Sequence, residues 1–339
     1  MDEQQTEFKF ANGLDYIERP RPAKEWIVEP LLSPGALINI YGAPKAGKSR
    51  LGLSLAMAIS SGQEYWLDRF KIHTHGPVLW LEVDNSPLEW VNVLKAVAFG
   101  EGKAEELANV HFADRDNVPY PFDLLDEEGQ HDVILAGMIE QFVAAVGERP
   151  VLIIIDTIRE CHSGDENDST ALRNVITKIQ AACGSYTAIG LISHSRKDGG
   201  LQAMISIDDD QGDTLMDDNR GSNYLVGKMQ TIIRVTCNQS KGYGYFTSRG
   251  REIGVIRFKM RQKPPAYLWY ADSDPAGELV RDLRRANPDW SDRRIAKEVA
   301  EQMKMTEEAA RSLTRRVGRK AEKSDAKRAK AILLAQQSQ

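Results

Sequence analysis

The feature that most constrains the fold of this chain is an eight-residue stretch, GAPKAGKS, at residues 42–49. An apolar segment at 35–41 precedes it, and apolar residues on one helical face follow it at 49–59. The stretch matches the pattern G-x-x-x-x-G-K-[ST], which forms a phosphate-binding loop when it lies between a strand and a helix. Because that context is present, the sequence predicts a P-loop nucleotide-binding core.

Each position of this loop has a physical reason. Glycines at 42 and 47 let backbone N–H groups turn towards phosphate oxygens at a helix N-terminus. Lys48 is expected to contact the β- and γ-phosphates, and the Ser49 hydroxyl to ligate Mg²⁺. The expected cofactors are therefore ATP and Mg²⁺. The candidate nucleotide-binding residues are Gly42, Ala43, Pro44, Lys45, Ala46, Gly47, Lys48, Ser49 and Arg50.

Strand-like and helical patterns alternate after the loop. The run VLIII at 151–155 is β-branched and uninterrupted, which is typical of a strand buried on both faces of a parallel sheet. The alternation predicts an α/β fold with a doubly wound, mainly parallel sheet. Strands are expected at 78–84, 110–113, 151–155 and 188–193, helices at 132–146 and 169–182, and further, antiparallel strands at 231–237, 254–260 and 266–270.

Three acidic residues follow or end predicted strands, at the sheet edge where ligands bind in open α/β folds. Asp156 is the candidate for a second Mg²⁺ contact, through the water shell of the metal. Glu82 and Asp84 are two residues apart on one predicted strand, so both side chains should point to one face. One of them should orient the attacking water. Asp84 is favoured because it lies nearer the catalytic end, and Glu82 is then an ordinary solvated or paired acid.

Three further side chains are candidates for sensing or completing the phosphate site. His194 ends a predicted core strand and could contact the γ-phosphate, although a lone histidine is often structural. Arg220 and Lys228 could be cations delivered in trans to the phosphates of a neighbouring subunit. Each could instead be a surface cation or part of a structural ion pair.

Charge and composition limit the other functions. The net charge of −5 argues against a general nucleic-acid coat. No apolar run is long enough to span a bilayer, and the polar start lacks a signal core, so a cytoplasmic protein without membrane contact is expected. The three cysteines lack the paired spacing of a zinc or redox site.

The C-terminal part is basic and helical in pattern. Ser291 can cap a helix through Gln302, and Thr306 can cap a second helix. That spacing resembles a helix-turn-helix that could bind duplex DNA, although a solvated basic tail or a handle for another protein is the alternative. The second helix carries Arg311, Arg315, Arg316 and Arg319. The expected organisation is a lead at 1–25, a core domain at 26–274 and a small all-α module at 275–339.

Taken together, these motifs resemble the RepA-type, RecA-like hexameric ATPases, which are replicative helicases of some plasmids and phages. The likeness covers roughly residues 26–270 and rests on the loop, on a single histidine before Arg196-Lys197, and on Arg220-Gly221-Ser222 followed by Lys228. The second strand of that family usually ends in Glu, where this chain has Asp84. The resemblance implies a homo-oligomer, a hexameric ring that moves on single-stranded DNA.

Two other functions stay open at the level of the sequence. A recombinase or annealing ATPase would form filaments on DNA, and an ATP-switched regulator would read a duplex site with its C-terminal helices. In the core, DNA contact is expected from the loop at 196–219, and only at its Arg196-Lys197 end. The rest of this loop is rich in aspartate and would repel phosphate.

Overall fold

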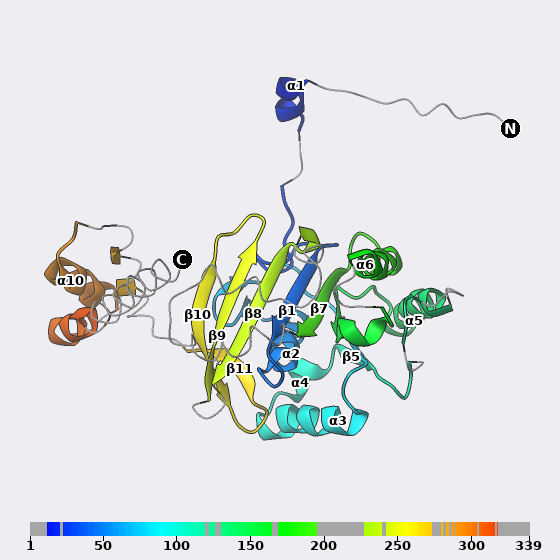
Figure 1. The fold of residues 1–339 in the computed structure, drawn as a ribbon. Coiled ribbons are helices and arrows are strands. Elements are labelled where there is room, and N and C mark those ends of the chain that lie inside the picture. The colour runs from blue at the N-terminus through cyan, green and yellow to red at the C-terminus, as the bar shows by residue number, and fades with distance from the viewer. Residues whose placement is uncertain are drawn as a thin grey trace, which may run out of the picture.

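A nine-stranded sheet forms the centre of the computed structural model (Figure 1). The strand order is β11-β10-β9-β8-β1-β7-β6-β4-β5. The described residues are 12–20, 23–118, 122–125, 130–164, 169–194, 227–238, 242–272, 279–280, 283–284, 287, 289–303, 305–315 and 317.

Six neighbouring strands of the sheet are parallel, and the three at one end are antiparallel. The predicted doubly wound, mainly parallel core is therefore confirmed. The parallel strands are β8 (Thr231–Asn238), β1 (Leu37–Gly42), β7 (Ala188–His194), β6 (Leu152–Asp156), β4 (Val78–Glu82) and β5 (Val110–Ala113). The antiparallel strands are β9 (Tyr243–Gly250), β10 (Ile256–Lys263) and β11 (Leu268–Ala271).

Helical segments flank the sheet, together with a small hairpin of β2 (Tyr65–Trp66) and β3 (Phe70–Lys71). The helix after the loop, α2 (Lys48–Ser60), contacts β1, β4, β6 and β7 of the sheet. The others are α1 (Gly13–Glu18), α3 (Pro87–Lys95), the π-helical turn η1 (Ala96–Gly100), α4 (Ala104–Leu107), α5 (Gln130–Val146), the 3₁₀ turn η2 (Ile158–Cys161), α6 (Ser169–Cys183) and α10 (Asp292–Gln302).

The central strands bury side chains on both faces, as the VLIII run predicts. On β6, Leu152 and Ile154 belong to one apolar core, which includes α2. Ile153 and Ile155 belong to a second core, which includes α5 and α6. Successive side chains of a strand point to opposite faces, so one continuous apolar run supplies both cores.

The structure corrects three predicted elements. The 78–84 strand ends at Glu82, so Asp84 does not share a strand with it. The strand at 231–238 pairs in parallel with β1, although an antiparallel strand was expected. The strand β9 was not predicted, because its sequence YGYFTSRG has two glycines and a serine and follows no alternating apolar pattern. Pairing with β8 and β10 is what makes it a strand.

The C-terminal part has a small apolar core of its own, built around Ile295, Val299 and Leu313. The predicted caps are present: the Ser291 side chain accepts from the Arg294 N–H, and the Thr306 hydroxyl accepts from the Ala309 N–H. The helix-turn-helix interpretation stays a prediction. In the part of the chain described here, no helix is long and apolar enough to cross a membrane.

Candidate nucleotide-binding site

The phosphate-binding loop lies between the end of β1 at Gly42 and the start of α2 at Lys48. Gly47 has a φ of 84°, in the left-handed region that favours glycine. A Cβ atom on Gly42 would lie 2.3 Å from the Val235 carbonyl oxygen. Both glycines of the motif are therefore required by this geometry, one by its backbone angle and one by the close approach of β8.

Lys48 lies over the loop that it ends. Its side chain is buried, and its Nζ donates to the Ala43 carbonyl oxygen at 3.2 Å and lies 3.2 Å from His194 Nδ1. Burial lowers the pKa of Lys48 to about 8, although the carboxylates of Asp156 and Asp84 oppose this effect. The arrangement places one ammonium group beside two acids, where a phosphate could replace the Ala43 and His194 contacts.

Asp156 is fully enclosed at the end of β6. Burial raises the pKa of its carboxyl group, while a hydrogen bond from Ser49 lowers it. Its Oδ2 is buried and has no hydrogen-bond partner among the described residues. A buried carboxylate oxygen without a donor, beside a hydroxyl, is the chemistry of a cation site, so Ser49 and Asp156 fit Mg²⁺.

A magnesium site of this kind needs few protein ligands, because Mg²⁺ keeps several waters and binds the phosphates. Accordingly, the described residues contain no group of three or more His, Cys, Asp or Glu side chains that could hold a metal by themselves. Ser49 and Asp156 are far apart in the sequence. They meet because α2 begins, and β6 ends, at the same edge of the sheet.

Glu82 is buried at the end of β4, where it pairs in register with Asp156. Its Oε1 accepts from the N–H groups of Asp84 and Asn85, at 3.2 and 2.8 Å, and from Asn85 Nδ2 at 3.0 Å. Its Oε2 accepts from Trp80 Nε1 at 3.3 Å. Burial, and then the charge of Asp156, raises the pKa of Glu82. This carboxyl group is committed to holding the turn after β4.

Asp84 lies in that turn and is half-buried. Its backbone N–H donates to the Asp156 carbonyl oxygen at 3.1 Å. The charge of Asp84 also acts on the pKa of both Lys48 and Asp156. Of the two acids, Asp84 is therefore the one with a more open carboxylate near the phosphate-binding loop.

Arg115, which the sequence did not single out, fixes the same turn from the end of β5. Its Nε and NH2 donate to the Val83 carbonyl oxygen at 3.0 and 2.8 Å, and NH2 donates to the Asp84 carbonyl oxygen at 2.7 Å. An arginine two residues past a predicted strand was the available signal. Only the pairing of β4 with β5 shows which backbone it contacts.

The remaining candidates lie in different places. His194 pairs in register with Gly42, so it stands beside the loop, as predicted. Arg220 and the loop at 196–219 lie outside the described residues. Arg50 is half-buried, and burial lowers its pKa.

Lys228 lies at the opposite edge of the sheet from the phosphate-binding loop. It borders a cavity of about 260 Å³, together with Gly35 and Leu37 at the start of β1. The loop begins at the other end of β1, about 20 Å away at the usual rise of a six-residue strand. Within one chain, Lys228 therefore cannot contact phosphates bound at this loop.

The antiparallel end of the sheet reaches the phosphate-binding loop through a second residue that the sequence did not single out. Trp269 on β11 is buried, and its Nε1 donates to the Gly47 carbonyl oxygen at 2.8 Å. A Cβ atom on Gly47 would lie 2.6 Å from the same nitrogen. The indole therefore holds the last loop residue in position.

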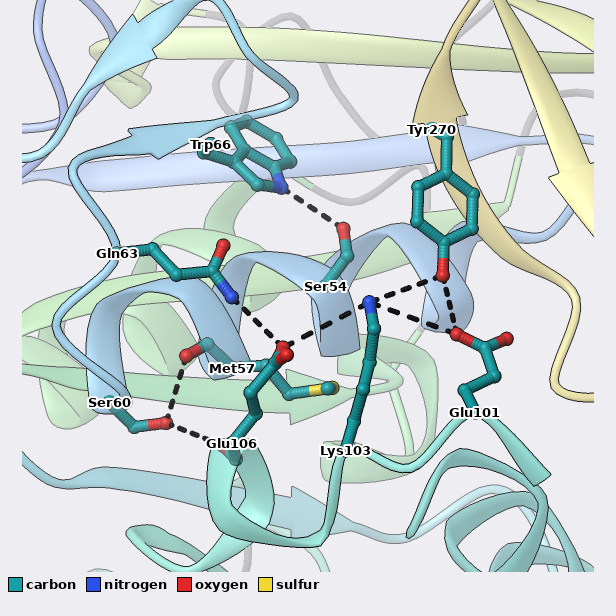
Figure 2. Close-up of polar contacts among 9 residues, drawn as sticks. All are labelled: Ser54, Met57, Ser60, Gln63, Trp66, Glu101, Lys103, Glu106 and Tyr270. Atoms are coloured by element: carbon teal, nitrogen blue, oxygen red, sulfur yellow. Dashed lines mark hydrogen bonds and ion pairs between the residues drawn. The ribbon is translucent and has the colours of Figure 1, made fainter. Parts of the chain in front are cut away.

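A cavity of about 200 Å³ lies along α2, with Trp269 in its wall. Figure 2 shows the polar side chains around it. Lys103 Nζ donates to the Tyr270 hydroxyl at 3.2 Å, Gln63 Nε2 donates to Glu106 at 2.9 Å, and Trp66 Nε1 donates to Ser54 at 3.0 Å. No residue of the phosphate-binding loop lines this cavity, so it is separate from the candidate site.

The fold and the loop together define a RecA-like P-loop ATPase. The chain belongs to the AAA domain family, whose model matches residues 4–200. Among solved structures, the ATPase domain of a helicase is similar at 12% identity and a TM-score of 0.49, over 70% of this chain and 85% of that one. The RadB recombinase is similar at 15% identity and a TM-score of 0.44, over 71% and 92%. No curated protein matches the chain.

Proposed function

We propose that this chain hydrolyses ATP with Mg²⁺ and uses the energy to move on or remodel single-stranded DNA, as a ring-forming replicative helicase of a plasmid or phage. The observation that carries the ATPase part is the convergence of Lys48, Asp156 and Asp84 at one sheet edge. Three groups far apart in sequence form there the cation, the metal ligand and the base that phosphoryl transfer needs.

In this proposal each side chain has one task. Lys48 exchanges its contact with the Ala43 carbonyl oxygen for the β- and γ-phosphates. Ser49 and Asp156 hold Mg²⁺, which neutralises charge on the phosphate oxygens. Asp84 accepts a proton from the attacking water, and Glu82 and Arg115 position it by fixing the turn. His194 stands beside Lys48, where loss of the γ-phosphate would change its surroundings.

The position of Lys228 supports an assembly of several copies. A lysine on the sheet edge away from its own phosphate-binding loop can act on ATP only in a neighbouring subunit, as the resemblance to ring-forming ATPases implies. Arg220 is proposed as a second cation of this kind. We propose a closed, six-membered ring in which each neighbour supplies these cations.

The ATPase part is tested with Lys48→Ala in the full-length chain. This variant should lose ATP hydrolysis and keep its circular dichroism spectrum. A folded Lys48→Ala protein with wild-type turnover would remove the P-loop assignment.

The DNA part is tested on a forked duplex. ATP-dependent strand displacement, with closed rings in negative-stain images, supports the helicase. Strand exchange or annealing on filaments would instead identify a recombinase. Tight binding to one duplex sequence with slow turnover would identify an ATP-switched regulator.

A further inference from the structure

The strand β10 has two chemically different faces. Phe258 and Met260 point into the core that includes α2. The alternate positions carry the other set, which consists only of cations: Arg257, Lys259, Arg261 and Lys263. Because alternate residues of a strand recur about every 6.6 Å on one face, these four cations form a row along β10.

The neighbouring strand adds tyrosines to the same face. Tyr243 pairs in register with Arg261, and Tyr245 pairs with Lys259. Lys259 Nζ lies 4.3 Å from the centre of the Tyr243 ring, and Arg257 Cζ lies 4.7 Å from the centre of the Tyr245 ring. We call this set of six residues, with Tyr243 and Tyr245 on β9 and the four cations on β10, the tyrosine–cation face.

This face is accessible and positively charged. The side chains of Lys259 and Arg261 are 37% and 59% exposed. Neither β9 nor β10 contains an acidic residue. One acid from beyond β11, Asp272, pairs with Lys259 at 3.4 Å and with Arg261 at 2.7 Å. The face therefore keeps a clear excess of positive charge after this pairing.

The face also lies where a long polymer could reach it. It belongs to the antiparallel end of the sheet, whereas α5 and α6 lie towards the other end, beyond β1 (Figure 1). The tyrosines and cations face away from the core that contains Phe246 and Phe258. In the sheet, β8 separates β9 and β10 from β1, the strand that leads into the phosphate-binding loop. The tyrosine–cation face is therefore a surface distinct from the nucleotide site.

We propose that the tyrosine–cation face binds single-stranded DNA, with the cation row along the phosphate backbone and the tyrosines stacked on bases. A row of regularly spaced cations suits a polyanion. Interleaved aromatic rings suit one with exposed π faces, which unpaired bases offer and an acidic peptide does not. A duplex would present phosphates but would keep its bases stacked internally.

This inference deepens the proposed function, because it assigns the DNA contact to the described core rather than to the loop at 196–219 alone. It does not depend on ATP hydrolysis. Binding can therefore be measured without nucleotide, on the full-length chain, by fluorescence anisotropy of a labelled oligothymidylate. A duplex of equal length is the comparison.

Two double variants separate the roles of charge and stacking. Arg257→Gln with Lys259→Gln should reduce the slope of log affinity against log salt by about 1.4, at about 0.7 per lost phosphate contact. Tyr243→Leu with Tyr245→Leu should leave that slope unchanged and weaken binding roughly tenfold or more, the scale expected from lost base stacking. Both should keep the wild-type circular dichroism spectrum and basal ATP hydrolysis.

Matched controls lie elsewhere on the surface. Lys71→Gln with Lys95→Gln removes two exposed lysines from β3 and α3, and Tyr186→Leu removes a tyrosine that is 79% exposed. These variants should bind the oligothymidylate like the wild type. Equal weakening by controls and test variants would reduce the effect to overall charge and overturn the proposal.

The other outcomes are also decisive. Wild-type affinity in both folded test variants would place the contact elsewhere, while the ATPase assignment would stand. Displacement of the oligothymidylate by polyglutamate at equal charge concentration, without any effect of the tyrosine changes, would mean a general polyanion surface and overturn the single-strand proposal. Conversely, a wild-type chain that binds through this face but never hydrolyses ATP would support the inference and refute the ATPase.

Discussion

Glu82 and Asp84 differ in what their carboxyl groups already do. The Glu82 carboxyl accepts four hydrogen bonds, from two backbone N–H groups, one amide and one indole. The Asp84 carboxyl lies in the half-buried turn that these bonds hold. The structure therefore strengthens the choice of Asp84 as the base, for a reason that strand position alone did not supply.

We predict opposite phenotypes for the two amide variants. Asp84→Asn should bind ATP and melt near the wild-type temperature, but should hydrolyse ATP about a hundredfold more slowly, the usual scale for losing a general base. Glu82→Gln places an amide N–H against the Trp80 donor, so it should lose about 1–3 kcal/mol of unfolding free energy. Thermal melts and turnover measured on both variants check this. A stable Glu82→Gln variant with the hydrolysis defect would reverse the assignment.

Lys48 leads to a prediction about pH. Its pKa is lowered from 10.5 to about 8 in the free protein, so its charge is lost as pH rises through about 8. Phosphate binding favours the charged form. Nucleotide affinity should therefore fall above pH 8, by at most about tenfold per pH unit, and should be little affected by Lys48 below that pH.

Isothermal titration of a nucleotide from pH 7 to 9.5 measures this dependence. Lys48→Arg is the control, because an arginine keeps its charge over the whole range and should flatten the profile. An affinity for the wild-type chain that is constant to pH 9.5 would show that the Lys48 charge is not titrated in this range.

At the scale of elements, β11 supports the phosphate-binding loop from outside the parallel core. The hydrogen bond from Trp269 to Gly47 spans 222 residues of sequence. Trp269→Phe should weaken nucleotide binding about fivefold, since it removes one hydrogen bond worth about 1 kcal/mol and leaves a buried carbonyl without its donor.

Trp66→Phe is a matched control for this change. Trp66 is equally buried, and its indole also donates to α2, but to the Ser54 hydroxyl instead of the loop. Both variants should lose some thermal stability. Only Trp269→Phe should change the nucleotide dissociation constant, so an equal loss of affinity in both would assign Trp269 to packing alone.

At the scale of the whole molecule, the C-terminal part is expected to be separable because it has its own apolar core. Truncation after Pro275 should leave a folded ATPase that single-stranded DNA still stimulates but that binds duplex DNA more weakly. Arg311 and Arg315 lie on the helix removed, although Arg311 also pairs with Glu307 at 2.8 Å. Duplex binding is measured at equal salt for both proteins, and equal affinities would rule out the helix-turn-helix interpretation.

The sequence by itself determined the features that are local along the chain. The loop at 42–49 needs its glycines and lysine at fixed spacing, and the VLIII run needs burial on both faces, so both could be recognised without neighbours. The order of these segments then implied a parallel sheet, because parallel strands need crossover helices. That placed Asp156 and His194 at the edge occupied by the loop.

Only the tertiary structure decided which distant residues meet. The clamp of Arg115 on the turn after β4, the bond from Trp269 to Gly47 and the pairing of β9 depend on strand neighbours that the local pattern does not encode. The cations of β10 were visible in the sequence as scattered charges. They became a row beside two tyrosines only when β9 and β10 paired in one register, because register sets which side chains share a face.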